Sequence, residues 1–164
     1  MLFQHGSELA IRATLFLAQQ APGKLSPVHK IADHAGVSEA YLAKILQRLA
    51  SAGLVRSFRG PGNGMELGRA ANTITLASVI QVMEGPRAAD ECVLGLGTCS
   101  EESFCVLHEE WIPIRTAIHN LLENTTLADL AELILTREAK AGARLASGYR
   151  APARAEIRRG KRHP

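Results

Sequence analysis

The sequence lacks any run of about eighteen apolar residues, the length that a helix needs to cross a bilayer, so a membrane-spanning protein is not expected. The N-terminus also lacks the basic flank, apolar block and small-residue cleavage site of a secretion signal. These absences predict a cytoplasmic protein with no membrane partner. Apolar residues make up 46% and charged residues 21% of the 164 positions, as in a soluble chain with one hydrophobic core.

Cysteine is scarce too, and its placement is uneven. The chain has three cysteines, Cys92, Cys99 and Cys105, and all of them fall in the stretch ECVLGLGTCSEESFCVLH, which ends at His108. We call residues 91–108 the cysteine segment. Three thiols cannot all pair within one chain, and a reducing compartment keeps thiols reduced. The sequence therefore argues against a disulfide framework and indicates a metal or redox role.

Positive charge is almost missing from the middle of the chain. Residues 71–136 carry two Lys or Arg against ten Asp or Glu, whereas residues 1–70 carry eight against four and residues 137–164 carry nine against two. A basic N-terminal part suits a polyanionic partner, and an acidic middle does not. We therefore expect the two parts to do different work.

The N-terminal part has the pattern of a winged helix. Residues 8–20 predict a first helix, and residues 26–53 predict a helix, a short turn at Gly36 and a second helix that begins after Ser38 and stops at Gly53. Two short apolar runs around a Gly/Pro/Asn-rich tip then predict a β-hairpin over residues 54–67. We expect a mainly α fold with a small β-hairpin wing, in which Ser26 caps the helix that opens with Pro27.

This arrangement predicts binding to double-stranded DNA. The second helix of a helix-turn-helix enters the major groove, and cationic side chains engage phosphates. An arginine at the tip of a glycine-rich hairpin fits a narrow minor groove. The residues that we expect at the DNA are Ser38, Glu39, Ala40, Tyr41, Lys44, Arg48, Ser57, Arg59 and Gly60.

Beyond the wing, residues 75–85 predict another helix, and the cysteine segment follows it. The stretch WIPIRTAIHNLLENT then repeats Trp111, Ile114, Ile118 and Leu121 at three- and four-residue spacing. Such a stripe packs either on its own domain or against a second copy, and a twofold DNA reader favours a homodimer. A short capped helix at TTLADLAELI and a basic tail, helical at first and then disordered, complete the chain.

Three chemistries fit the cysteine segment. Zinc accepts three Cys and one His, but structural zinc sites usually have ligand pairs two to four residues apart. An iron-sulfur cluster accepts wider spacing, and reactive thiols that form disulfides on oxidation are the third possibility. Glu101 and Glu102 look like a helix start, which would place Cys105 near a first turn that favours thiolate.

With IADHAGVSEAYLAKILQRLASAGLVRSFRGPGNG, TLASVIQVMEG and the three cysteines in this order, the sequence resembles the Rrf-two family of bacterial winged-helix regulators. The resemblance implies a dimeric transcription regulator, a repressor rather than an enzyme, whose operator binding is controlled by an iron-sulfur cluster. Cys92, Cys99 and Cys105 match the ligands of the family. The fourth ligand would be His108, as in 2Fe-2S members, or Glu8 from the partner subunit, as in 4Fe-4S members.

The signal that the resemblance implies is nitric oxide, redox state or iron-sulfur and iron status. The alternative is a regulator of the same fold that responds to a thiol or metabolite without a cluster. An enzyme with a Cys/His pair is a third class, which has no recognisable nucleophile setting here. We expect a DNA-binding domain over residues 1–86, a cysteine loop with a long dimerisation helix over 87–136, and a tail over 137–164.

Overall fold

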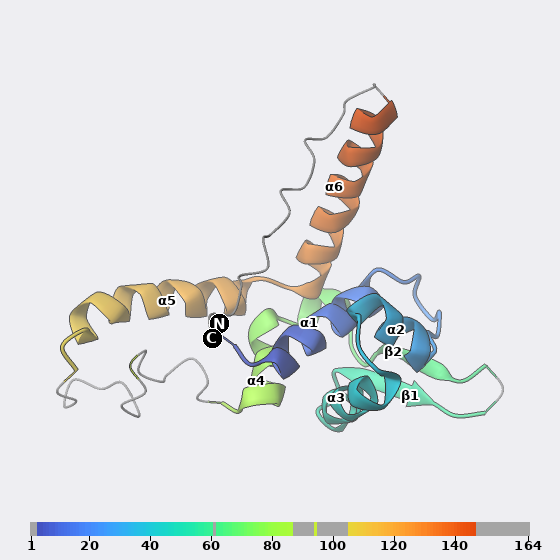
Figure 1. Ribbon diagram of the computed structural model, residues 1–164, viewed down its shortest axis with the longest axis horizontal. Coiled ribbons are helices and arrows are strands. Elements are labelled where there is room, and N and C mark those ends of the chain that lie inside the picture. Colours follow the sequence, from blue (N-terminus) through green and yellow to red (C-terminus); the bar gives the residue numbers. More distant parts are fainter. Residues whose placement is uncertain (1–2, 61, 87–93, 95–104, 147–164) are drawn as a thin grey trace, which may run out of the picture. The chain divides into compact units, whose positions relative to one another are not determined.

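Helices dominate the computed structural model, which describes residues 3–60, 62–86, 94 and 105–146 (Figure 1). The backbone forms two units, Met1–Glu132 and Leu133–Pro164. The elements are α1 His5–Ala18, α2 Val28–Ala35, α3 Glu39–Ser51, β1 Val55–Phe58, β2 Gly64–Leu67, the 3-10 turn η1 Ala71–Thr73, α4 Leu76–Glu84, α5 His108–Asn124 and α6 Leu127–Ala146. A mainly α fold with one antiparallel hairpin confirms the expected winged helix.

The core of the first unit lies between α1, α2, α3 and α4. Leu9 and Ala13 of α1, Ile31 of α2 and Leu42 of α3 have no exposed surface, and Val79 of α4 packs in the same cluster. These positions recur at three- and four-residue intervals, so each helix buries one face. The opposite face of α3 is exposed, as the sequence pattern predicted.

The turn between α2 and α3 and the start of α2 show how local chemistry sets the helix ends. Gly36 ends α2 in the left-handed region at φ 73°, where glycine has no steric penalty. The start of α2 differs from our prediction, because Pro27 is the N-cap and Val28 is the first helical residue. Ser26 instead exchanges two backbone hydrogen bonds with Met65, at 2.9 and 2.8 Å, which hold it extended beside the wing.

The wing is a two-stranded hairpin in which Val55 pairs with Leu67 and Phe58 with Gly64. Its base approaches the end of α3 closely. The backbone N–H of Gly68 donates to the carbonyl of Leu54 at 2.9 Å, and a Cβ atom at Gly68 would lie 2.4 Å from the carbonyl oxygen of Gly53. The hairpin can therefore close onto the helix-turn-helix only because position 68 has no side chain.

We expect Gly68→Ala to lower the free energy of unfolding by about 1–3 kcal/mol, the usual cost of overpacking. The atom it would strike belongs to the backbone, so relief requires the wing to shift. Urea titration followed by circular dichroism measures the effect. Gly6→Ala is the control, because its Cβ would meet only the flexible end of Met83 at 3.3 Å. Equal stability of the two variants would contradict the prediction.

The segment after the wing is tied together at the junction of α5 and α6. The backbone N–H of Leu76 donates to the carbonyl of Thr125 at 3.0 Å, and that of Leu127 donates to Ile74 at 2.9 Å. Thr75 caps α4 by accepting from the backbone N–H of Ser78 at 3.2 Å. These bonds hold the end of α5 against the start of α4.

α6 begins with a reciprocal cap and is longer than the sequence suggested. The hydroxyl and the backbone N–H of Thr126 donate to the Asp129 carboxylate at 2.6 and 2.9 Å, which lowers the pKa of Asp129 below its ordinary value. We predicted a short helix here and a tail that is helical at first; the structure joins the two in one helix, α6, which runs for 20 residues through Ala146. The stretch REAKAGARLA consists mainly of good helix formers, so nothing ends the helix at Arg137.

Candidate nucleic-acid interface and cysteine segment

The outward face of α3 carries the first group of predicted DNA contacts. Ser38, Glu39, Ala40, Tyr41 and Lys44 are all exposed. Ser38 is the N-cap residue, and in the described part of the chain its hydroxyl makes no capping bond. The first backbone N–H groups of α3 therefore lack an intrahelical partner and suit an anionic group such as a phosphate.

A groove joins the start of α3 to the wing. Glu39 lines it from α3, Ser57, Arg59 and Gly60 line it from the hairpin, and residues at the start of α2 close it, namely Pro27, Val28 and His29. Residues that lie 18 or more positions apart in the sequence, Glu39 and Ser57 among them, thus share one concave surface. The expected DNA contacts at the start of the second helix and those on the hairpin therefore lie beside one another.

The two wing arginines have different surroundings. Arg56 pairs with Glu66 across the strands at 2.7 Å and lies 5.8 Å from the ring centroid of Phe58. Arg59 is exposed at the hairpin tip and has no ion pair within the residues that the structure describes. Arg59 is therefore the arginine of the wing whose guanidinium can engage a new anion without first losing a partner.

Toward its C-terminal end, the outward face of α3 borders a different part of the fold. Tyr41, Lys44 and Arg48 line a second pocket together with Gln4 and Ser7 at the start of α1. The guanidinium of Arg48 donates from Nη2 to the carbonyl oxygens of Val82 and Met83, both at 2.8 Å. Arg48 therefore caps the C-terminal end of α4, and sequence reasoning that assigned it to DNA did not anticipate these two bonds.

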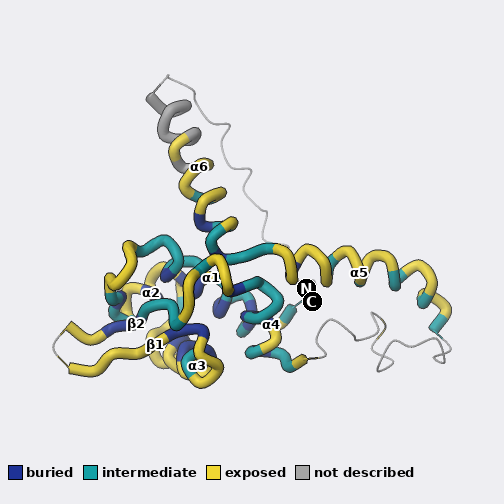
Figure 2. The backbone as a smooth tube through the Cα atoms, turned by 180° about the vertical axis from the view of Figure 1, so that it is seen from behind, coloured by how far each residue is buried: buried dark blue, intermediate teal, exposed yellow. Residues whose placement is uncertain are grey.

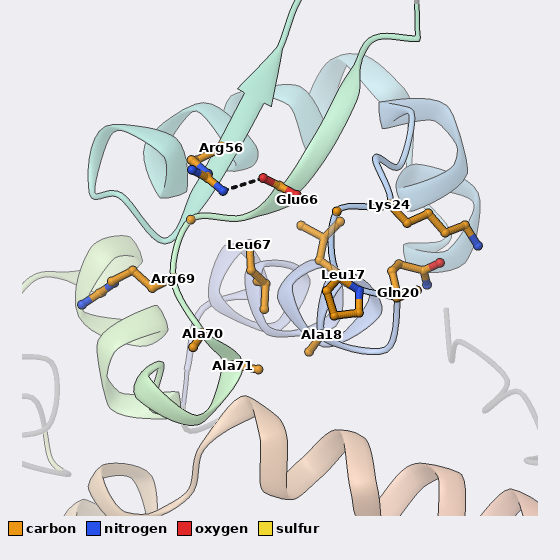
Figure 3. Close-up of a pocket in the computed structure, with 14 residues that line it drawn as sticks. Leu17, Ala18, Gln20, Lys24, Arg56, Glu66, Leu67, Arg69, Ala70 and Ala71 are labelled. Atoms are coloured by element: carbon orange, nitrogen blue, oxygen red, sulfur yellow. Dashed lines mark hydrogen bonds and ion pairs between the residues drawn. The ribbon is translucent and has the colours of Figure 1, made fainter.

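A third pocket lies between the end of α1 and the base of the wing. Figure 3 shows Lys24 and Arg69 on opposite sides of this pocket, with the Arg56–Glu66 pair joined beside Leu67. Our sequence reasoning named neither Lys24 nor Arg69. Both side chains are exposed, and each residue directly follows a glycine in the sequence.

The cysteine segment is described only at its C-terminal end and at Leu94. Cys105 is half-buried just before α5, and the backbone N–H of His108, the first residue of α5, donates to its carbonyl at 3.1 Å. Cys92 and Cys99 lie outside the described residues. Within the described ranges no three His, Cys, Asp or Glu side chains gather as a metal site, so the full ligand set stays a prediction.

Glu8, the other candidate for the fourth ligand, lies in the first turn of α1. Its carboxylate is 3.5 Å from Nδ1 of His5, and its side chain is 33% exposed. The turn that carries Glu8 is fixed from outside α1, because the carboxylate of Glu84 accepts from the backbone N–H of Gln4 at 2.8 Å and from the hydroxyl of Ser7. Glu84 is the last residue of α4, so this end of α1 lies against the end of α4.

α5 exposes most of its surface in the single chain (Figure 2). Of the apolar stripe, Ile114 is 52% and Leu121 is 64% exposed, while Leu122 on a neighbouring face is buried. The indole Nε1 of Trp111 is buried and has no hydrogen-bond partner among the described residues. Packing against α4 therefore accounts for one face of α5 only. No helix in the described ranges is long and apolar enough to cross a membrane.

Comparison with known families and proteins places the chain among transcription regulators. Residues 3–133 match the family model described as Rrf2, iron-dependent transcriptional regulator. The HTH-type transcriptional regulator IscR of Vibrio campbellii is 34% identical over 121 residues, which cover 74% of this chain and 71% of the relative. A putative HTH-type transcriptional regulator of Mycobacterium tuberculosis, MT1325, is 35% identical over 146 residues, or 88% of each chain.

Solved structures of similar proteins have the same fold. CymR of Bacillus subtilis, described as the global cysteine regulator, matches with a TM-score of 0.69 and 30% identity over 80% of this chain and 96% of that one. IscR of T. potens matches with a TM-score of 0.64 and 28% identity over 79% of this chain and 85% of that one. The matching structures therefore include both a protein described as a cysteine regulator and an IscR.

Proposed function

Because the chain belongs to the Rrf2 family of iron-dependent transcriptional regulators, we propose that it is a dimeric repressor whose operator binding is controlled by an iron-sulfur cluster. The chain is a DNA-binding transcription regulator and not an enzyme. The finer proposal is that Cys92, Cys99 and Cys105 hold the cluster and that nitric oxide, redox state or iron-sulfur supply is the signal. A regulator of bacterial operators acts in the cytoplasm, and we propose that location.

The types of ligand in the cysteine segment support the cluster proposal. Three cysteines within one short segment supply soft thiolate ligands, which suit iron-sulfur clusters, and an imidazole or carboxylate can complete the set. Cys105 is half-buried just before α5 rather than sealed in the core, a position that suits a ligand shared with a centre at the surface of the fold. When bound, a cluster would supply a centre that changes oxidation state or is degraded by its signal.

The fourth ligand distinguishes two forms of the proposal. His108 lies three residues after Cys105, across the turn in which its backbone N–H donates to the Cys105 carbonyl at 3.1 Å, and would complete the set from the same segment. Glu8 lies on α1 and would have to come from the partner subunit, as the family resemblance implies. The first arrangement favours a 2Fe-2S cluster and redox or supply sensing, and the second favours a 4Fe-4S cluster and sensitivity to nitric oxide or oxygen.

A second candidate function has a specific observation in its favour. The fold matches CymR, a cysteine regulator by description, with a TM-score of 0.69. On this alternative the protein would respond to a thiol or a metabolite, and its three cysteines would carry no iron. Operator binding would then be unaffected by changing each cysteine to serine.

Anaerobic purification separates the two candidates. We expect a coloured protein with bound iron and labile sulfide, and electron paramagnetic resonance of the reduced protein distinguishes the two cluster types. A colourless protein that contains neither iron nor sulfide, yet still binds operator DNA, would refute the cluster and support the alternative.

For the DNA complex, we propose that α3 enters the major groove and that the hairpin tip reaches the neighbouring minor groove. The groove shared by Glu39 and Arg59 supports this arrangement, because it places the start of α3 beside the wing. Glu39 could accept from the N4 amino group of cytosine, and Arg59 suits a narrow minor groove. A dimer would present two such readers to a twofold-symmetric operator.

We expect Arg59→Ala to weaken operator binding by about 1–3 kcal/mol, the usual size of a specific contact. Arg59 has no intramolecular ion pair among the described residues, so its loss should leave the fold intact. Fluorescence anisotropy with a labelled operator measures the affinity. Arg137→Ala removes the same charge from the exposed surface of α6 and serves as the control. An affinity unchanged by Arg59→Ala would remove this residue from the interface.

A further inference from the structure

The last turn of α4 is bonded to two other helices. We call Val82, Met83 and Glu84 the α4 end. The carbonyls of Val82 and Met83 accept from Arg48 of α3, both at 2.8 Å. The carboxylate of Glu84 accepts from Gln4 and Ser7 at the start of α1. Three consecutive residues thus hold both the helix that reads DNA and the helix that carries Glu8.

Both bonds from Arg48 are charge-assisted and join α3 to the end of α4. The last carbonyls of a helix have no intrahelical partner, and a guanidinium both satisfies them and complements the negative end of the helix dipole. Met83 is 9% exposed, and its bond to Arg48 is part-buried, whereas the bond to Val82 is exposed. A shift of the α4 end therefore acts directly on the position of α3.

The bonds to Glu84 act in the same way on α1. Ser7 has no exposed surface, so its hydroxyl must keep a partner or leave a buried polar group unsatisfied. Gln4 is the N-cap residue of α1 but makes no side-chain cap of its own, and Glu84 supplies the acceptor near this end instead. A displacement of the first turn of α1 would therefore disturb the α4 end.

Between these contacts lies open space. Gln4, Ser7, Tyr41, Lys44 and Met83 line a pocket of about 210 Å³ with Arg48. A closely packed interior leaves little free volume for a helix to shift. The pocket between α3 and the α4 end supplies such volume, so α3 has room to move. The face of α3 with Tyr41 and Lys44 borders this space.

We propose that Arg48 is a positioning residue that couples the ligand state of the cysteine segment to α3 through the α4 end. The inference rests on the proposed function, since it names the route by which the same site is regulated. Residues proposed as ligands flank the joint: Glu8 lies one residue after Ser7, and the cysteine segment begins seven residues after Glu84. In this arrangement the cluster-loaded and cluster-free forms differ in the position of the α4 end, and Arg48 passes that difference to the DNA-reading surface.

The test compares operator affinity with and without cluster in the full-length protein. The DNA is a fragment selected by the wild-type protein from a random library, and the cluster is removed with a chelator. Arg48→Ala should keep the visible spectrum of the wild type but bring the affinities of the two forms together. Arg48→Lys, which retains a donor, should restore part of the difference. Gln47→Ala, an exposed neighbour on α3, should behave as the wild type.

Two outcomes would overturn the coupling role. An affinity ratio unchanged by Arg48→Ala would show that the bonds to α4 transmit nothing. An equal loss of affinity in both forms would make Arg48 a DNA contact or a fold residue only.

A second measurement keeps the inference testable if the wild type has no cluster, which would refute the proposed function alone. Hydrogen exchange of the α3 amides in the cluster-free protein should speed up in Glu84→Gln. The same substitution should have no further effect once Arg48 is alanine, because the connection is already broken. Additive effects of the two substitutions would overturn the route through the α4 end.

Discussion

Cys105→Ser is expected to give a colourless protein with little bound iron, whose operator affinity no longer depends on the signal. A serine hydroxyl stays protonated at neutral pH and is a hard oxygen donor, whereas the cluster needs soft thiolates. Loss of a supporting neighbour of a metal ligand already costs about 10–100-fold in affinity, and loss of a ligand itself should cost more. Cys105 is the proposed thiol ligand that the structure describes, half-buried just before α5.

The measurement combines absorption spectra, iron and sulfide analysis and operator titration, all under anaerobic conditions. Val106→Ser is the matched control, since it introduces the same side chain one residue away at a position that is 91% exposed. We expect that control to keep both colour and regulation. A Cys105→Ser protein with full iron content would exclude this thiol from the ligand set.

The same design identifies the fourth ligand. His108→Ala should destabilise the cluster if the ligand comes from the cysteine segment, and Glu8→Gln should do so if it comes from α1. A mixture of Cys105→Ser and Glu8→Gln tests donation in trans, because neither variant should hold the cluster alone, whereas in a mixed dimer Glu8 of one subunit can complete the intact cysteines of the other. The variant that loses its colour identifies the fourth ligand. The spectrum of the wild type should then be that of a 2Fe-2S cluster if the ligand is His108 and of a 4Fe-4S cluster if it is Glu8.

The sequence predicted the helix-turn-helix well because its information is local. Leu42, Ile45 and Leu46 recur with the helical period and are buried, whereas Lys44 and Gln47 of the same helix are exposed. Glycine marks the turn at Gly36 with φ 73°, and the Gly/Pro-rich tip marks the wing. Such signals act within a few residues, so a single sequence contains them in full.

The bonds that connect distant segments could not be predicted in this way. Arg48 donates to carbonyls 34 and 35 residues away, and any exposed arginine on a DNA-reading helix has the same sequence appearance. Ser26 resembled a helix cap because Pro27 follows it, yet its backbone pairs with Met65 on the wing. The need for glycine at position 68 arises from the approach of the Gly53 carbonyl. Each of these depends on how the finished elements pack, which no local pattern encodes.

Ile114→Glu combined with Leu121→Glu is expected to convert a dimer to a monomer and to weaken operator binding by about 10²–10⁴-fold, the usual gain from linking two binding modules. Both side chains are more than half exposed in the single chain, at 52% and 64%. They share a helical stripe with Trp111, whose indole N–H lacks a partner among the described residues. A second α5 would bury this stripe, and two carboxylates placed there would have to be desolvated without a partner.

Sedimentation velocity gives the oligomeric state, and titration of full operators and half-sites separates the loss of avidity from damage to the reader. The half-site affinity should stay at its wild-type value, because neither residue belongs to the groove lined by Glu39 and Arg59. Thr116→Glu is the matched control: Thr116 is exposed, and at 100° per residue it faces away from the stripe. If the double variant still sediments as a dimer, the interface lies elsewhere, and the exposed stripe on α5 needs another occupant.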